Sequence, residues 1–319
     1  MHARIAGTGR YLPSRILTNK ELEAMVDTSD EWIRSRTGIC QRHIAREDET
    51  VSSMSEIAAR RALEMADLKP QDIDLIVMGT TTPDQVFPNS AVIMQERLGI
   101  QSIPAFTIEA ACSGFIYALS IAEKFIRLGD ARHVLVLGAE KIAPLVNWKD
   151  RNTCIIFGDG AAAIVLSAAE VPGVLDTQLH ADGQYRDLLY FPSGPGKNFK
   201  HMSQDSIQMH GDEVFKTAVN VMSELAVETL ERNRLTSHDL DWLIPHQANL
   251  RIIQAVAKRL DMPMDKVIVT VDQFANTSAA SIPLALDVAV RDGRIQRGDL
   301  LLLESFGGGF TWGSALIRY

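Results

Sequence analysis

The sequence predicts an α/β fold built from two similar halves, each with a sheet that is covered by helices on both faces. Short, fully apolar segments alternate with segments of helical periodicity along the chain, as at Leu75–Met78 and Leu300–Leu303. Such strands are typical of sheets buried on both faces. Similar segments also recur in the same order at offsets of about 150 to 170 residues, which indicates an internal duplication. We therefore expect stacked α-β-α-β-α layers.

Three pairs of similar segments support the duplication. They are Asp74–Gly79 with Asp241–His246, Gly129–Glu140 with Gly298–Glu304, and the segments that begin at Phe157 and Phe306. Each match is weak alone because buried strands resemble one another, but the shared order indicates that they belong together. We expect one half at residues 1–170 and the other at 171–319.

Each half is predicted to contain three core strands separated by helices. The strands are Leu75–Met78, Phe106–Ile108 and Val134–Leu137 in the first half, and Leu243–Ile244, Val267–Val271 and Leu300–Leu303 in the second. Apolar residues at helical spacing predict helices over Ser52–Ala66 and Val214–Leu230. The polar stretch Val171–Ser206 is expected to link the halves through strands and loops.

Composition narrows the class of protein. Hydrophobic content of 46% and charged content of 23% are those of a globular protein, and the net charge of −8 argues against nucleic-acid binding. No apolar segment approaches the ~20 residues of a membrane span, and the first residues lack a signal-peptide pattern. Three dispersed cysteines imply no disulfide framework. We expect a cytoplasmic enzyme with no membrane partner.

Cys112 is the candidate nucleophile. In the segment "EAACSGFIYAL" it lies between a buried strand and the first turn of a helix, among small residues. A helix N-terminus favours a thiolate, and a nearby imidazole can share the thiol proton. The alternative is a small buried core residue, which most free cysteines are. Cys40 and Cys154 lack this setting and are interpreted as structural.

His246 and Asn276 are the candidate partners of Cys112. All three follow predicted core strands, and related halves would bring these positions together at the carboxyl ends of the strands. A histidine in such a place is also compatible with a surface or core role, and Asn276 with a helix N-cap. The run Gly307-Gly308-Gly309 is compatible with a tight turn, with backbone N–H groups that approach a reacting oxygen, or with both.

Several segments together resemble the β-ketoacyl-acyl carrier protein synthase III family of thiolase-fold condensing enzymes. They are "GTGRYLP", "DTSDEWIRSRTGI", "AACSGF", "FGDGAAA", "PHQANLRII", "FANTSAAS" and "FGGGFTWGSAL". Elongating synthases of this fold have histidine where Asn276 stands, and thiolases use a second cysteine. Chalcone synthases share the Cys-His-Asn set, but "DEWI" and "PHQANLR" are similar to the priming class.

The resemblance implies a two-step reaction. Cys112 would be acylated by a short acyl-CoA, acetyl-CoA foremost, with the oxyanion on the backbone N–H groups of Cys112 and Gly309. Malonyl-acyl carrier protein would then lose CO₂, with its thioester oxygen bound by His246 and Asn276. The product would be a β-ketoacyl-carrier protein that initiates fatty acid synthesis. Coenzyme A thioester would be a substrate, and no cofactor or metal is expected, in line with the absence of CxxC and HExxH patterns.

Coenzyme A is expected to bind near "DTSDEWIRSRTGI". Trp32 and Arg36 stand four residues apart on one face of a predicted short helix capped by Thr28 or Ser29, which suits an adenine and its phosphates. A surface aromatic covered by an arginine stem explains the spacing equally well. By resemblance, Trp32 and Arg151 would sandwich the adenine. The other residues that the resemblance brings to this site are Thr28, Arg36, Gly211, Ala248 and Asn249.

Two partners are expected besides acyl-CoA. The helix after Asn249 carries Arg251, Lys258 and Arg259 and no acidic residue, which suits an acidic acyl carrier protein, although most charged helix faces are simply solvated. The expected docking residues are Gln247, Arg251, Lys258 and Lys216. By analogy with thiolase-fold enzymes we also expect a homodimer, in which Phe87 caps the acyl pocket of the partner.

The sequence is compatible with two other functions. A thiolase-fold acyltransferase or condensing enzyme of secondary metabolism would keep the same three residues but use a different acceptor. An inactive scaffold subunit would not need them. The choice of acyl-CoA cannot be derived from the sequence.

Overall fold

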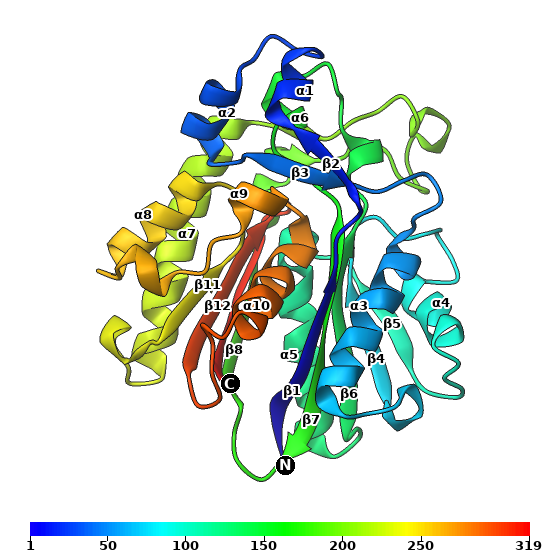
Figure 1. The fold of residues 1–319 in the computed structure, drawn as a ribbon, viewed down its shortest axis with the longest axis vertical. Helices are drawn as coiled ribbons and strands as arrows, with labels where there is room; N and C mark the ends of the chain where they lie inside the picture. Colours follow the sequence, from blue (N-terminus) through cyan, green and yellow to red (C-terminus); the bar gives the residue numbers. More distant parts are fainter.

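The computed structural model describes residues 1–319 and contains two main sheets that lie side by side (Figure 1). The first is a five-stranded sheet in the order β1-β7-β6-β4-β5. Strands β6, β4 and the edge strand β5 are parallel, and β7 runs antiparallel to both β6 and β1. The strands are β1 (His2–Tyr11), β4 (Leu75–Gly79), β5 (Ala105–Ile108), β6 (His133–Glu140) and β7 (Gly160–Ala169).

The second sheet repeats this order. It is four-stranded, β11-β12-β13-β8, with β11 parallel to β12, and with β13 antiparallel to both β12 and β8. Its strands are β8 (Val174–Ala181), β11 (Trp242–Pro245), β12 (Leu300–Gly307) and β13 (Thr311–Arg318). The matched order of strands bears out the internal duplication that the repeated segments predicted.

One predicted strand is wrong. The segment Val267–Val271 forms a single parallel bridge between Val267 and Leu243, and Val271 already begins the short helix α9 (Val271–Phe274). The buried side chain of Gln247 explains the difference, because its amide takes over strand hydrogen bonds. It donates to the carbonyl of Ile268 at 3.1 Å and accepts from the N–H of Thr270 at 2.8 Å.

Helices separate and cover the two sheets in five layers. Helices α3 and α4 cover the outer face of the first sheet, α5 and α10 lie between the sheets, and α7 and α8 cover the outer face of the second. The longer helices are α3 (Val51–Ala66), α4 (Ser90–Arg97), α5 (Gly114–Leu128), α7 (Gly211–Arg232), α8 (Leu250–Arg259) and α10 (Ser281–Arg291). The predicted α-β-α-β-α arrangement is confirmed.

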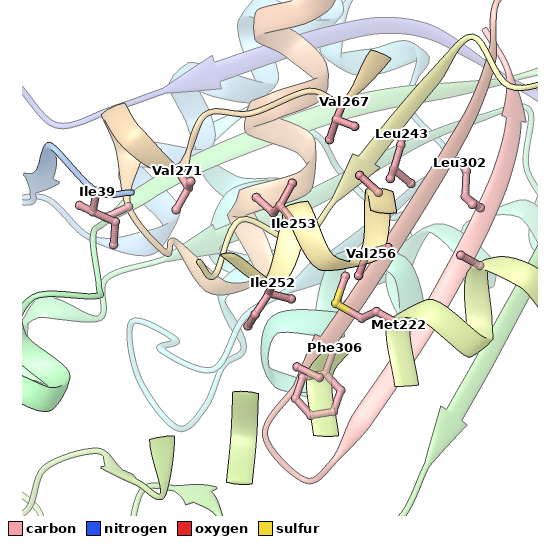
Figure 2. Close-up of a cluster of buried hydrophobic side chains, with 14 of the residues drawn as sticks. Ile39, Met222, Leu243, Ile252, Ile253, Val256, Val267, Val271, Leu302 and Phe306 are labelled. Carbon is pink, nitrogen blue, oxygen red and sulfur yellow. The ribbon is translucent and has the colours of Figure 1, made fainter. Parts of the chain in front are cut away.

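The core between α7, α8 and the second sheet is shown in Figure 2. Met222 of α7 and Ile253 and Val256 of α8 pack against Leu302 and Leu243 of the sheet. These side chains are almost fully buried, and each contributes about 1.5–3 kcal/mol on burial. The packing fixes α8, which begins four residues after the candidate site residue His246.

Smaller elements lie outside the two sheets. The antiparallel pair of β2 (Arg15–Thr18) and β3 (Gln41–Ile44) lies over one end of the molecule, together with the helices α1 (Asn19–Glu23) and α2 (Asp30–Thr37) that connect the two strands. The segment that was expected to link the halves contains β8 and the short strand β9 (Leu189–Tyr190), which pairs with β10 (Gln208–Met209). Helix α6 (Arg151–Cys154) faces α2. None of the helices has the length and apolar character needed to cross a membrane.

Candidate active site

Cys112 lies in the 3-10 turn η2 (Ala111–Ser113), directly before α5. Only 7% of its surface is exposed, and its carbonyl accepts a hydrogen bond of 2.7 Å from the hydroxyl of Ser305 on β12. Helix α5 can come this close to the first sheet because of Gly79, where a Cβ would meet the backbone of Gly114 at 2.4 Å. The predicted place of Cys112 at a helix start is confirmed.

Burial dominates the ionisation of Cys112 in this site. It raises the pKa of the thiol to about 12, and the charge of Glu140 adds to the rise. Hydrogen bonding with the side chain of Ser278 acts in the opposite direction and lowers the pKa. The helix start alone therefore does not make this thiol a thiolate, contrary to what its position in the sequence suggested.

His246 follows β11 and is 3% exposed. Burial lowers the pKa of its imidazole to about 3, so the ring is neutral near pH 7, and its Nδ1 has no hydrogen-bond partner in the protein. A neutral ring can donate one hydrogen bond to a substrate oxygen. Such a low pKa makes it a weak proton acceptor, which argues against the expectation that it shares the thiol proton.

Asn276 lies after α9, next to the 3-10 turn η8 (Ser278–Ala280). Its backbone pairs with Phe157, and its Oδ1 accepts the N–H of Ser278 at 2.8 Å. The residue that caps α10 is Ala280, so Asn276 is not the N-cap of that helix. The amide nitrogen of Asn276 makes no hydrogen bond within the protein and is free to donate to a ligand.

The end of β12 connects His246 with Cys112. The main-chain carbonyl of Glu304 accepts the backbone N–H of His246 at 2.8 Å, and the hydroxyl of Ser305 donates to the carbonyl of Cys112. Gly307 lies against the turn of Cys112, because a Cβ there would meet the backbone nitrogen of Cys112 at 2.6 Å. The end of this strand of the second sheet therefore meets the start of α5 at Cys112.

In the run Gly307-Gly308-Gly309, one glycine packs closely on Cys112 and another has an unusual backbone conformation. Gly307 is the glycine that packs on Cys112, while Gly309 has a φ of +134°, a region that side chains rarely adopt. Both interpretations of the run, a turn and an approach of backbone to the site, are therefore compatible with the structure. The assignment of Gly309 to an oxyanion hole stays a prediction.

A buried carboxylate that the sequence analysis missed lies beside Cys112. Glu140, at the end of β6, accepts hydrogen bonds from Thr80, Thr81 and Thr82, and from the hydroxyl of Ser278 at 3.1 Å. Burial raises the pKa of Glu140 to about 7. The signal in the sequence was an acidic residue at the end of an otherwise apolar strand.

Several of the residues predicted to bind coenzyme A lie on α2 or contact it. Ser29 caps this helix and accepts the N–H of Trp32 at 3.1 Å, and Asn249, the N-cap of α8, donates to the carbonyl of Arg36 at 3.1 Å. The hydroxyl of Thr28 is buried without a partner. Gly211, the first residue of α7, is exposed, and Ala248 is half-buried.

Trp32 and Arg151 face each other directly. The guanidinium of Arg151 lies 4.9 Å from the centre of the Trp32 ring and that of Arg36 lies 6.0 Å away. Arg151 is also held by the carbonyl of Asp27 at 3.0 Å. The Trp32–Arg151 separation leaves no room for a purine, so the two groups would have to move apart to hold adenine between them.

The basic residues of α8 are exposed as predicted. The guanidinium of Arg251 stacks on the ring of Phe215 of α7 at 5.1 Å. Lys258, further along the same helix, lines a groove of about 510 Å³ between α7 and α8. Lys216 is exposed near the start of α7. The prediction for Gln247 needs correction, because it is 1% exposed and its amide is used by the backbone, which leaves nothing for a docking partner.

Phe87 is the most exposed large apolar side chain of the loop after β4, with 82% of its surface accessible. Neighbouring Val86 is 58% exposed. The loop ends beside the edge strand β5, where the side-chain amide of Asn89 donates to the carbonyl of Ala105 at 3.4 Å. Such exposure within one chain is typical of a contact surface.

The remaining cysteines lie away from the site. Cys154 is buried in the core between α7, α8 and the N-terminal elements, where burial raises its pKa to about 11. Cys40 is half-buried, and the guanidinium of Arg34 lies 2.7 Å from its sulfur. Nowhere in residues 1–319 do three or more His, Cys, Asp or Glu side chains gather as they would around a metal ion.

Two copies of one sheet pattern, with a buried cysteine at their seam, define a condensing enzyme of the thiolase fold. The family model described as 3-oxoacyl-[acyl-carrier-protein (ACP)] synthase III matches residues 106–183. The model of the C-terminal part of the same family matches residues 230–319. A β-ketoacyl-[acyl-carrier-protein] synthase III of Xanthomonas campestris is 58% identical, with 100% of this chain and 99% of that protein covered. The chain belongs to the β-ketoacyl-acyl carrier protein synthase III family and is an acyltransferase of fatty acid synthesis.

Solved structures agree with this assignment. The 3-oxoacyl-[acyl-carrier-protein] synthase III of Aquifex aeolicus has a TM-score of 0.94 at 47% identity, with 99% of this chain and 100% of that chain covered. The priming β-ketosynthase of the R1128 polyketide biosynthetic pathway has a TM-score of 0.94 at 38% identity, with 99% and 96% covered. The chain is thus similar both to fatty acid synthases of this type and to a polyketide enzyme.

Proposed function

We propose that this protein condenses acetyl-CoA with malonyl-acyl carrier protein through an acyl-Cys112 intermediate. The observation that carries the proposal is the burial of Cys112 at the start of α5, against the end of β12, which also holds the backbone of the neutral His246. Asn276 supplies a second neutral donor in this proposal. Acylation breaks the thioester bond of acetyl-CoA and forms a thioester on Cys112. Backbone N–H groups, those of Cys112 and Gly309 in this proposal, stabilise the oxyanion.

The second half of the reaction uses the two donors. Loss of CO₂ from the malonyl group leaves an enolate, whose oxygen accepts hydrogen bonds from His246 and from the amide of Asn276. The enolate carbon then attacks the acyl-cysteine and releases the Cys112 sulfur. A neutral imidazole suits this role, because it donates a hydrogen bond without transferring a full charge. Decarboxylation drives the new carbon–carbon bond, and we propose no resident cofactor.

Product analysis tests this function. The purified protein, given acetyl-CoA and malonyl-acyl carrier protein, is expected to release CO₂ and to form acetoacetyl-carrier protein in equal amounts. A secondary-metabolism acyltransferase is the second candidate, favoured by the likeness to the polyketide priming enzyme. Transfer of the acetyl group to an oxygen or amine, without release of CO₂, would support that alternative and reject condensation.

We also propose where the two halves of the chain divide, how two copies assemble and where the enzyme acts. The two halves divide at residues 170 and 171, between the end of β7 and the start of β8. A second copy pairs along β5, which is an edge strand with half-buried residues. The enzyme acts in the cytoplasm on acyl-CoA and an acidic carrier protein. Sedimentation of the purified protein as a monomer would reject the dimer.

Reversal of one charge tests carrier docking. Arg251→Glu is expected to raise the KM for malonyl-acyl carrier protein about tenfold at low salt, because complementary charges speed association, and the effect should shrink as salt screens it. Acylation by acetyl-CoA should change little. Arg132, exposed at the far end of β6, provides a matched control as Arg132→Glu. An unchanged KM in Arg251→Glu would place the docking surface elsewhere.

Phe87 is expected to limit the length of the acyl group. Phe87→Thr should raise kcat/KM for longer or branched acyl-CoAs relative to acetyl-CoA, about tenfold or more, since removing a large ring opens space worth roughly 1–3 kcal/mol in an apolar pocket. Phe87→Tyr keeps the ring and serves as the control. A panel of acyl-CoAs measures the preference, and the same preference in Phe87→Thr and in the native protein would contradict the proposed cap.

A further inference from the structure

The amide of Asn276 can stabilise an enolate only if its nitrogen, rather than its oxygen, is left to donate. The nitrogen donates hydrogen bonds, whereas the oxygen only accepts them. The backbone N–H of Ser278 determines the orientation, because it donates to Oδ1 of Asn276 at 2.8 Å. A reversed amide would place its own N–H groups against this donor. The position of Ser278 therefore decides which end of the Asn276 amide is free.

Ser278 has a backbone conformation that needs support. Its φ of +49° lies in the left-handed region, which residues with a side chain rarely adopt unless their surroundings hold them there. The turn η8 that contains Ser278 rests directly on β6, because a Cβ at Gly138 would collide with the carbonyl oxygen of Ala279. Two residues further along β6, Glu140 accepts the hydroxyl of Ser278 at 3.1 Å. Strand β6 thus supports the turn both by packing and by a hydrogen bond.

We propose that the carboxylate of Glu140 fixes the amide of Asn276 in its donating orientation by holding the hydroxyl of Ser278. In its neutral form Glu140 holds Ser278 less firmly, and condensation becomes slower. The inference deepens the proposed function and rests on the role of Asn276 as a donor to the enolate. Glu140 touches no substrate and acts as a positioning residue.

The surroundings of Glu140 favour a charged group that only accepts hydrogen bonds. Its side chain is fully buried, and its two oxygens accept from four hydroxyl groups and one backbone N–H. The donors belong to Thr80, Thr81, Thr82 and Ser278. A carboxylic acid would have to donate a proton itself, so one of these hydroxyl groups would have to turn and accept. The remaining bonds would also weaken, because hydrogen bonds to a charged group are roughly twice as strong as neutral ones.

Both forms of Glu140 are accessible near neutral pH. Burial raises the pKa of Glu140 to about 7, while the bonds from Thr82, Thr81 and Ser278 act in the opposite direction and lower it. The charged form, which holds Ser278, therefore prevails above about pH 7, and the neutral form prevails below it. The pH of the solution thus gives experimental control over the proposed support.

The charged groups on the segments around Glu140 have partners of their own. The ammonium of Lys141 donates to the main-chain carbonyls of Arg46 and Glu49. The thiol of Cys112 stays neutral near pH 7, because burial raises its pKa to about 12. The carboxylates are Asp84, which accepts from Ser52, Asp159, which accepts from Ala45 and Ala143, and Glu109, which accepts from Ala111.

Glu304 is a second buried carboxyl group and lies on β12. Its side chain has no hydrogen-bond partner in the protein, and burial raises its pKa well above the usual range. Side chains alternate along a strand, so Glu304 shares a face with Leu302 and Phe306, which pack in the core toward α7 and α8. Glu140 instead contacts the turn η8. The two carboxyl groups therefore have different surroundings, and a variant of each distinguishes them.

Single-turnover condensation isolates the step in which Asn276 acts. The protein is first acetylated on Cys112 and freed of acetyl-CoA, then mixed with saturating malonyl-acyl carrier protein, and CO₂ release is followed at a series of pH values. Acetylated Cys112 has no thiol to titrate, and His246 stays neutral because its pKa is about 3. In the native protein the rate should rise with pH through a midpoint near 7 and then become constant.

Glu140→Gln should abolish this pH dependence. Its rate is expected to lie about ten- to a hundredfold below the native maximum at every pH, because a small misplacement of a reacting group costs up to about 10² in rate. Acetylation of Cys112 should not slow, since the charge of Glu140 opposes the thiolate in the native protein. A damaged fold would slow both steps. Ser278→Ala keeps the backbone bond to Asn276 but removes the hydroxyl, and it should lose the pH dependence as well.

Two further variants test whether Glu140 is the titrating group. Thr81→Val removes one hydroxyl donor and should move the midpoint to higher pH by about one unit, as expected for the loss of a hydrogen bond to a charged group. Glu304→Gln is the matched control, because it removes the other buried carboxyl group and should leave the midpoint near pH 7.

Three outcomes would overturn the proposal. They are a native rate with no midpoint near pH 7, a midpoint that persists in both Glu140→Gln and Ser278→Ala, and a midpoint that is lost in Glu304→Gln. None of them would affect the proposed function, because CO₂ is still released by the acetylated native protein. Absence of CO₂ from the acetylated native protein at every pH would instead reject the proposed function.

Discussion

Replacement of Cys112 by serine is expected to lower acyl transfer from acetyl-CoA by at least about ten-thousandfold, as the loss of other nucleophiles does. A serine hydroxyl is far less acidic than a thiol, and the neutral imidazole of His246 is too weak a base to activate it. Single-turnover transfer from labelled acetyl-CoA to the protein measures the effect. Condensation should be lost to the same extent, because it follows acylation.

Cys40→Ser is the matched control for this variant. Cys40 is half-buried beside Arg34, away from the site, and its replacement should leave acyl transfer within about twofold of the native rate, as expected for a change away from special features. Thermal unfolding of both variants separates a chemical loss from a loss of fold. Substantial transfer in Cys112→Ser, or its loss in Cys40→Ser, would contradict the assignment of the nucleophile.

His246→Ala and Asn276→Ala are expected to have the second largest effect. Each removes a donor to the enolate oxygen, so decarboxylation of malonyl-acyl carrier protein should fall about 10²–10³-fold. Acylation of Cys112 by acetyl-CoA should persist, because no enolate forms in that step. Release of CO₂ and single-turnover acylation measure the two steps separately.

Asn276→Asp refines the test. The aspartate keeps an oxygen that can accept the N–H of Ser278 but replaces the amide donor by a carboxylate. Decarboxylation should therefore be lost as in Asn276→Ala, with the local turn preserved. Equal and complete loss of acylation and decarboxylation in both Asn276 variants would contradict the division of roles.

The repeated segments allowed the fold to be predicted because each carries a buried strand. Asp74–Gly79 and Asp241–His246 form β4 and β11, which hold equivalent places in the two sheets. The same pattern gave a wrong prediction of a strand at Val267–Val271, which has the composition of a strand. There the amide of Gln247, more than twenty residues away in the sequence, replaces a neighbouring strand. Hydropathy does not reveal such a side-chain contact.

The site was predictable in part for similar reasons. Cys112 and His246 follow strands β5 and β11 as expected, and β12 lies against both of their backbones. Asn276 follows the short helix α9 instead of the predicted strand. The pair of Ser278 and Glu140 was missed because the two residues come from different halves and their side chains meet only in the folded protein. The ionisation of Cys112 was also misjudged, because the sequence shows a helix start but not the depth of burial.

Mass spectrometry of the native protein after incubation with acetyl-CoA tests the account most directly. The account predicts one acetyl group for each chain, located on the peptide that contains Cys112. The group should disappear when malonyl-acyl carrier protein is added, as CO₂ and acetoacetyl-carrier protein form. Acetylation of Cys40 or Cys154 instead, or condensation with no covalent acetyl intermediate, would contradict it.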